Sequence, residues 1–299
     1  MKLRIGTRRS RLALAQANEV ADALRSVGLQ AELVPMETSG DRGADPSIDP
    51  AGLKGLFVAE IVRALQDSEV DLAVHSAKDL PSEEPEGLVI AAVPERADPH
   101  DVLVTREGSV GRGAVVGTSS PRRRAQLLRA RPELEVRDLR GNVDTRLRKL
   151  EEGELDAVVL AAAGLVRLGI EPSHAEQLPF EQMVPAPGQG ALAIQTRTDD
   201  TATREALACL EHEPSRTALV AERTLMEALG GGCALPLGAL ATFERGRVRM
   251  VAVVADPDGS RLVRTDSLAD SGPSAAAKAV DNLLAQGAGE ILAELRGEI

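Results

Sequence analysis

Residues 75–79 combine side chains that could do chemistry. The run His75-Ser76-Ala77-Lys78-Asp79 directly follows an apolar stretch, residues 70–74, that is typical of a strand. In open α/β sheets, ligands bind beyond the carboxyl ends of the strands, so a site is expected at this run. A carboxylate beside a lysine stays ionised and can stabilise a developing cation, which makes Asp79 the candidate for chemistry. A solvated turn after a strand is the alternative.

Two later segments have the pattern of anion-binding helix starts. In residues 118–124, three hydroxyl residues end an expected strand, a proline takes the first helical position, and three arginines follow. Free backbone N–H groups, hydroxyls and the positive helix terminus favour an anion, and arginine matches a carboxylate or phosphate. Residues 140–146 again form a strand end, a turn and a helix start, one strand–helix unit later, so the same reasons favour an anion there. The two segments would converge on one cleft; a capped helix with an exposed arginine face is the alternative for each.

A glycine-rich turn, Gly230-Gly231-Gly232, precedes the thiol of Cys233. Glycines clear side chains from around the thiol and let the backbone approach a ligand, so Cys233 is a candidate for covalent chemistry. A flexible turn is the alternative. Cys209 has a helical context and is expected to be a small core residue. The sequence shows no metal-ligand spacing and no phosphate-binding glycine loop, so no metal is expected.

Composition limits the possible partners. The chain has 299 residues, a net charge of −11, three phenylalanines, and neither tryptophan nor tyrosine. Both the charge and the lack of stacking aromatics disfavour nucleic acid as a partner. No apolar run approaches the ~20 residues that span a bilayer, and no leader is recognisable, so a cytoplasmic protein with no membrane partner is expected. Residues 118–149 nevertheless carry a net +6, which leaves −17 for the rest of the chain.

These side chains need a scaffold of alternating strands and helices. Strands are expected at 3–7, 31–36, 70–74, 115–118, 135–139, 157–161 and 191–196. Helices are expected at 11–25, with Ser10 as N-cap, and at 56–66, 121–131 and 142–152. This alternation predicts βαβ units in mainly parallel sheets. From about residue 213 a helix (215–229), three strands (238–243, 247–255 and 260–266) and a last helix from about 273 predict a separate α+β domain.

The chain resembles the hydroxymethylbilane synthase family, also called the porphobilinogen deaminase family, in seven motifs that occur in the family's order. They span residues 3 to about 240 and include Thr7-Arg8-Arg9-Ser10, Gly55-Leu56-Phe57-Val58, His75-Ser76-Ala77-Lys78-Asp79, Gly117-Thr118-Ser119-Ser120, Arg140-Gly141-Asn142, Pro187-Gly188-Gln189-Gly190 and Gly231-Gly232-Cys233. The resemblance implies an α/β fold with two doubly wound, periplasmic-binding-protein-like domains flanking a cleft, plus a C-terminal α+β domain. The expected domains are 1–95 with 189–209, 96–188, and 213–299.

The resemblance also implies an activity and a cofactor. Such an enzyme condenses four porphobilinogen units head to tail with loss of ammonia, then releases hydroxymethylbilane by hydrolysis. A dipyrromethane cofactor serves as primer, and its thioether attachment would fall at Cys233. The expected partner is the small molecule porphobilinogen, and the family is usually monomeric.

Site residues carry over position by position. Asp79 would be catalytic, because a fixed carboxylate stabilises the cation left when ammonia departs. Polycarboxylate pyrroles call for many cations, hydroxyls and amides, together with a stacking ring. The implied cofactor- and substrate-binding residues are Arg8, Ser10, Asp41, Lys54, Phe57, His75, Ser76, Lys78, Thr118, Ser119, Ser120, Arg122, Arg123, Arg140, Asn142, Arg146, Arg167 and Gln189. Ala59 departs from the family pattern, because many members have lysine there.

Other classes of protein remain as alternatives. A non-catalytic, two-lobed anion-binding protein would explain the arginines but not the Cys233 turn. A pyridoxal-phosphate enzyme could use Lys54 or Lys78 but lacks an evident ring-binding arrangement. Nucleic-acid binding through residues 118–149 has the charge but lacks aromatic side chains.

Overall fold

The first lobe is built on a five-stranded sheet. The computed structural model describes residues 1–37, 59–230 and 235–298. The strands lie in the order β2-β1-β3-β10-β4, and their bounds are β1 Lys2–Arg8, β2 Gln30–Met36, β3 Leu72–Ser76, β4 Leu88–Ala92 and β10 Leu192–Arg197. Helix α1 (Arg11–Ser26) and the helical residues 59–66 pack on this sheet. The Oγ of Ser10 accepts from the N–H of Ala13 at 3.3 Å, so Ser10 caps α1 as expected.

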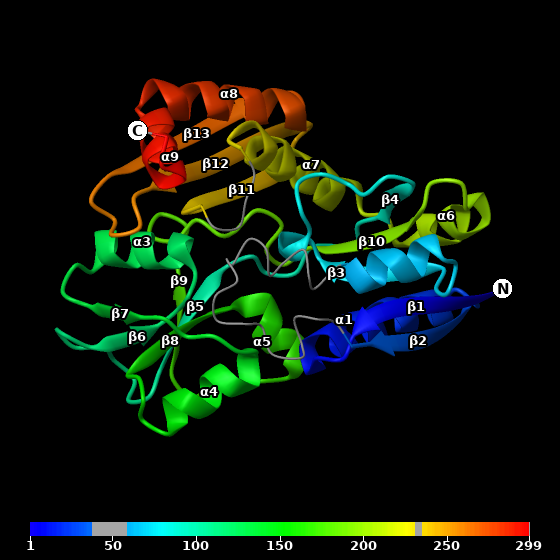
Figure 1. Ribbon diagram of the computed structural model, residues 1–299, viewed down its shortest axis with the longest axis horizontal. Helices are drawn as coiled ribbons and strands as arrows, with labels where there is room; N and C mark the ends of the chain where they lie inside the picture. Colours follow the sequence, from blue (N-terminus) through cyan, green and yellow to red (C-terminus); the bar gives the residue numbers. More distant parts are fainter. Residues whose placement is uncertain (38–58, 231–234, 299) are drawn as a thin grey trace.

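The second lobe repeats the arrangement. Its sheet has the order β7-β6-β8-β5-β9, with bounds β5 Asp101–Thr105, β6 Val115–Gly117, β7 Glu135–Arg137, β8 Ala157–Ala161 and β9 Ala175–Leu178. The helices of this lobe are α3 (Pro121–Ala130), α4 (Val143–Glu151) and α5 (Ala162–Leu168). Figure 1 shows the two lobes side by side, with α1 of the first lobe next to α5 of the second.

Each sheet contains one strand that runs against its neighbours, while the other four strands share one direction, so the expectation of mainly parallel sheets is confirmed. In the first lobe β10 pairs antiparallel with both β3 and β4. In the second lobe β5 pairs antiparallel with both β8 and β9. Both reversed strands arrive from the other lobe, through the connecting segments 93–100 and 179–191, so they enter the sheet from the opposite end. The strands β4, β5 and β9 had not been predicted.

The C-terminal unit is an antiparallel sheet covered by helices, as predicted. Its strands are β11 Leu237–Glu244, β12 Arg247–Ala255 and β13 Leu262–Ala269, in that order. The helices α7 (Glu213–Ala228), α8 (Gly272–Ala285) and α9 (Ala288–Arg296) bury a single apolar cluster against it. Between the lobes and this unit lie α6 (Thr201–Leu207) and a 3-10 turn, Ala208–Leu210. Cys209 lies in that turn and is exposed, so the expectation of a core cysteine was wrong.

A buried glutamate joins all three parts of the chain. Glu222 of α7 is fully buried and receives Arg96 Nη1 at 2.6 Å and the backbone N–H groups of Gly188 and Ala241 at 2.6 and 2.8 Å. Arg96 and Gly188 belong to the two segments that connect the lobes, and Ala241 belongs to β11. The two connecting segments also bond to each other, because Arg96 Nε donates to the carbonyl of Gln189 at 2.8 Å. The C-terminal unit is therefore fixed to the junction between the lobes.

The two α/β lobes and the C-terminal α+β unit match the fold class predicted from the sequence. The domain boundaries at 95, 188 and 213 stay a prediction. Among the described helices, none combines the length and apolar character needed to cross a membrane.

Candidate functional site

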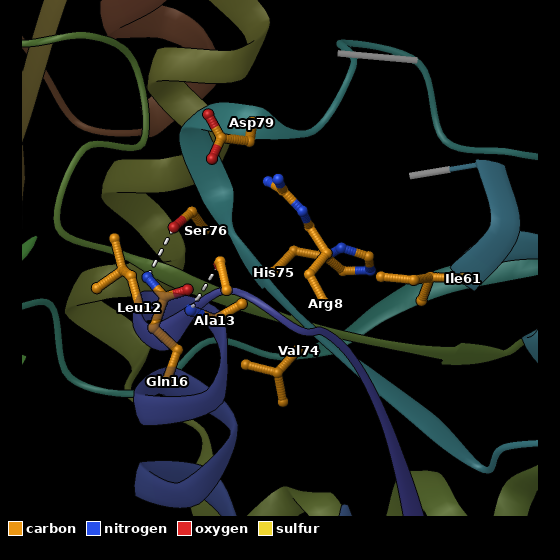
Figure 2. A pocket seen from close by; sticks show the side chains of 10 residues that line it. Arg8, Leu12, Ala13, Gln16, Ile61, Val74, His75, Ser76 and Asp79 are labelled. Atoms are coloured by element: carbon orange, nitrogen blue, oxygen red, sulfur yellow. Dashed lines mark hydrogen bonds between the residues drawn. The ribbon is translucent and has the colours of Figure 1, made fainter. Parts of the chain in front are cut away.

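A pocket lies at the carboxyl ends of β1 and β3. It is lined by Arg8, Ser10, His75, Ser76 and Asp79, together with Leu12, Ala13, Gln16, Ile61 and Val74. Five predicted site residues from two distant sequence segments therefore face one space, which Figure 2 shows from close by. The two strands pair in parallel, with Ile5 opposite Leu72, so their ends meet at the same edge of the sheet.

The first turns of α1 form one wall of this pocket. Gln16 is buried, and its Nε2 donates to the Oγ of Ser76 at 2.7 Å (Figure 2). This bond fixes the start of the 3-10 turn Ala77–Asp79, which presents Asp79 to the pocket. Gln16 had not been predicted as a site residue. Its only sequence signal was a polar side chain at a position of α1 that faces the sheet.

His75 is a buried, neutral imidazole. Burial lowers its pKa to about 4, against smaller raising effects from a hydrogen bond with Gln195 and the negative charge of Asp79. At neutral pH the ring therefore carries no charge. In this state His75 contributes shape and hydrogen-bonding atoms beside Asp79.

Arg146 brings the second lobe to Asp79. It follows the N-terminus of α4, and its Nε donates to the carbonyl of Gly141 at 2.8 Å. Burial, and to a smaller extent the positive charge of Arg123, lower the pKa of Arg146 to about 10, against a raising effect of the negative charge of Asp79. The guanidinium remains charged at neutral pH and lies within electrostatic range of Asp79, so the second lobe contributes charge near the pocket.

Arg122 and Arg123 surround a buried carboxylate that the sequence analysis missed. Asp101, at the start of β5, is fully buried and accepts from Arg122 Nη1 at 2.6 Å and from Arg123 Nη2 at 2.7 Å. Burial alone would raise the pKa of Asp101, but the two guanidiniums and Gln189 hold it well below its usual range. The side chains of both arginines are nearly buried and also donate to the carbonyls of Val184 and Val159. Their binding of ligand carboxylates stays a prediction.

Gln189 links this ion cluster to Lys78. Its side chain is fully buried, donates to Asp101 Oδ1 at 3.0 Å and to the carbonyl of Pro99 at 2.8 Å, and accepts from Lys78 Nζ at 3.4 Å. Lys78 precedes Asp79 in the same turn. A continuous polar path therefore runs from the arginines of α3 to the residue beside Asp79.

The hydroxyl residues before α3 have separate roles. Thr118 is buried and its Oγ1 accepts from the N–H of Ser120 at 3.2 Å, while the Oγ of Ser120 accepts from the N–H of Arg123 and caps α3. The Oγ of Ser119 is buried and has no hydrogen-bond partner among the described residues. Asn142 caps α4 by accepting from Thr145 at 2.9 Å. Ser119 is therefore the hydroxyl of this group that is available to a ligand.

The remaining predicted residues fall into two groups. Arg140 is exposed, and Arg167 pairs with Glu19 of α1 at 2.8 Å. Asp41, Lys54, Phe57 and Cys233 lie outside the described residues. The described chain reaches Gly230, three residues before Cys233, at the end of α7.

The fold and the pocket define a class: a two-lobed α/β protein with a pocket at the strand ends that places a carboxylate near arginines of both lobes. Comparison with known proteins gives the family. Residues 3–205 match the family model "Porphobilinogen deaminase, dipyromethane cofactor binding domain", and residues 217–286 match "Porphobilinogen deaminase, C-terminal domain". The chain belongs to the porphobilinogen deaminase family, whose members are transferases.

Individual relatives agree with the family models. The chain is 46% identical to a porphobilinogen deaminase of Brevibacillus brevis, over 99% of this chain and 98% of the relative. It is 50% identical to that of Desulforudis audaxviator, over 98% and 97%. The structure of an arginine-specific periplasmic binding protein of Salmonella typhimurium aligns at 14% identity with a TM-score of 0.42, over 70% of this chain and 91% of that one. The family membership disfavours the alternative of a non-catalytic anion-binding protein.

Proposed function

We propose that this chain joins four porphobilinogen molecules head to tail and releases hydroxymethylbilane, with Asp79 as the catalytic carboxylate. The observation that carries the proposal is the placement of Asp79 in a pocket at the strand ends, within electrostatic range of the partly buried, charged Arg146. This arrangement occurs in a chain that matches the porphobilinogen deaminase family along almost its whole length.

Asp79 acts on the charge that develops when ammonia leaves. The bond between the aminomethyl carbon and nitrogen breaks, ammonia departs with the electron pair, and the pyrrole is left with positive charge shared by its ring N–H. A fixed, ionised carboxylate stabilises this cation. When the next pyrrole carbon forms the new carbon–carbon bond and loses its proton, Asp79 is also placed to accept and pass on that proton.

Each porphobilinogen brings an acetate and a propionate group, so the growing chain becomes a polyanion. Arginines and hydroxyls that face the junction supply the matching donors. The buried donors that have no hydrogen-bond partner among the described residues include the Oγ of Ser119 and the Nη2 of Arg167. An unpaired buried donor costs free energy, so these two atoms favour an oxygen-rich ligand.

The same donor set fits a dipyrromethane cofactor, the group named in the family model. When bound, this cofactor supplies the pyrrole carbon onto which the first substrate is joined. We place its thioether at Cys233 and its carboxylates against Arg8, Arg146, Ser119 and the helix starts of α3 and α4. The chain's own residues would orient the cofactor, while Asp79 remains the group that stabilises charge.

Intact mass spectrometry tests the attachment. The purified protein is expected to exceed its sequence mass by two condensed pyrroles, and Cys233→Ala is expected to abolish the excess. Cys209→Ala is the matched control, because Cys209 is the other cysteine and is exposed. A protein of unmodified mass that still consumes porphobilinogen would exclude a covalent primer.

Turnover of porphobilinogen tests Asp79. Asp79→Ala is expected to fold normally and lower kcat by a factor of about 10² to 10⁴. Glu83→Ala removes an exposed carboxylate four residues along and should leave kcat within twofold. Wild-type turnover in Asp79→Ala would remove Asp79 from the mechanism.

We also propose that the protein acts as a cytoplasmic monomer. The acidic net charge of −11 supports a well-dissolved chain. Sedimentation equilibrium over a hundredfold concentration range tests the monomer, and a mass that rises with concentration contradicts it.

A further inference from the structure

Two ion pairs of opposite polarity connect α1 to the second lobe. Arg11, at the first position of α1, pairs with Asp144 of α4. Two turns further along α1, Glu19 Oε2 accepts from Arg167 Nε of α5 at 2.8 Å. The order of charges is therefore positive then negative on α1, and negative then positive on the second lobe.

The pair between Glu19 and Arg167 is asymmetric. The Arg167 side chain is only 8% exposed, whereas that of Glu19 is 45% exposed. Arg167 Nη2 is buried with no hydrogen-bond partner among the described residues. Glu19 thus covers one edge of the guanidinium, and its carboxylate can move into solvent. Arg167 then still has N–H donors that need acceptors.

This pair lies next to the pocket. Leu12 and Gln16 line the pocket, and their spacing to Glu19, seven and three residues, places all three on one face of α1. Gly164 of α5 faces Leu12, since a Cβ on this glycine would lie 3.8 Å from Leu12 Cδ2. Arg167 follows Gly164 by about one helical turn. Figure 1 shows α1 next to α5. The contact between these two helices therefore carries the pocket wall and, one turn away, the ion pair.

We propose that Glu19 is a positioning residue that occupies Arg167 in place of a ligand carboxylate, and that a carboxylate of the growing oligopyrrole displaces it. This inference rests on the proposed function, which supplies the carboxylates. Exchange of one carboxylate for another keeps a charge on Arg167 compensated throughout, so the chain can bind there and later leave without exposing a bare buried cation.

The exchange predicts a specific effect of Glu19→Gln. Without the competing charge, ligand carboxylates bind Arg167 more tightly. Loss of an ion pair with one half-exposed partner should change their affinity about fivefold, or roughly 1 kcal/mol. The protein is given limiting porphobilinogen, and the covalent complexes with one to four added pyrroles are measured by intact mass. We expect the ratio of one successive pair of complexes to shift about fivefold toward the longer chain, with a lower KM and little change in kcat.

Two control variants separate exchange from other effects. Asp22→Asn removes a carboxylate from the same helix, where Asp22 pairs with Arg25 of that helix at 2.8 Å. Asp144→Asn removes the other interlobe pair, so it reports on loosening of the lobes alone. Both should leave the ratios within twofold of wild type. On an Arg167→Gln background, Glu19→Gln should have no further effect.

The outcomes are distinct. If wild-type protein forms no ladder of covalent complexes, the proposed function fails. If the ladder forms but Glu19→Gln leaves every ratio within twofold, the role of Glu19 is refuted. An equal shift in Asp144→Asn, or a shift that persists on the Arg167→Gln background, also refutes it. A fivefold shift confined to Glu19→Gln in the presence of Arg167 supports the exchange.

Discussion

Replacement of Asp101 by asparagine tests whether the buried ion cluster holds the second lobe together. Asp101 is fully buried and balances the guanidiniums of Arg122 and Arg123, which are only 4% and 6% exposed. Asparagine keeps the size and one acceptor oxygen but removes the charge, which leaves two buried cations without a counterion. Removal of one partner from a buried ion pair costs about 3–5 kcal/mol. We therefore expect Asp101→Asn to lower the Tm by roughly 10 °C.

The pH dependence of this loss follows from the direction of the pKa shift. The pKa of Asp101 is held well below its usual range by the two guanidiniums, against the raising effect of burial. The stabilisation is therefore fully present above the unfolded-state pKa of about 3.9 and disappears only as the pH falls through the lower, folded-state value. The difference in free energy of unfolding between wild type and Asp101→Asn should be constant from pH 5 to 8 and should become smaller below pH 4.

Urea unfolding followed by circular dichroism measures this difference, and Asp266→Asn is the matched control. Asp266 pairs with Arg249 on β12 and β13, where both side chains are about half exposed, so its loss should cost less than about 1 kcal/mol. If the free energy of unfolding of Asp101→Asn lies within about 1 kcal/mol of the wild-type value, the ion cluster does not stabilise the second lobe as argued.

Two further predictions concern a buried imidazole and the junction of the lobes. Because burial holds the pKa of His75 at about 4, its ring signals in NMR should titrate near that pH. The free energy of unfolding should fall as the pH drops from about 6.5 to 4, because the unfolded chain binds a proton that the folded ring does not. This fall should be steeper in wild type than in His75→Gln. A midpoint near 6.5 would contradict the buried, neutral ring. Gly190 has φ +87° and a Cβ there would lie 2.3 Å from the carbonyl of Ala97, whereas Gly246 has φ +79° and open space. Gly246→Ala should cost about 1–2 kcal/mol of backbone strain. Gly190→Ala should lower the urea midpoint well beyond that loss. Equal losses in the two variants would show that the two connecting segments can separate at no cost.

Local signals in the sequence were sufficient for much of the fold. Ser10 and Pro121 mark the starts of α1 and α3 within one residue, because capping and the fixed φ of proline act within one helical turn. The position of the pocket at one edge of the first sheet could also be predicted from local sequence. His75 to Asp79 follow a buried strand, and parallel strand ends meet at one edge regardless of what lies further along the chain.

Long-range partners could not be predicted. Asp101 pairs with arginines 21 and 22 residues away and with an amide 88 residues away, and its sequence context, an acidic residue before an apolar run, resembles any strand start. The reversed strands β5 and β10 depend on the chain passing twice between the lobes. Glu19 had no signal at all, because a glutamate in the middle of an amphipathic helix is expected to face solvent.

Part of the arginine-rich segment serves the fold itself, while its binding of ligand carboxylates stays a prediction. Residues 118–149 carry a net +6, yet Arg122 and Arg123 bind Asp101, and Arg124 donates to the carbonyl of Val136 at 3.1 Å. These three arginines thus hold the strand ends and helix starts in place. Within the same segment, Arg146 is only partly buried, and its charge interacts with those of Arg123 and Asp79. A partly desolvated cation binds an anion more strongly than a fully solvated one, because less of its water shell has to be removed. One such arginine in the field of Asp79 can therefore do more for a polycarboxylate ligand than the segment's whole net charge.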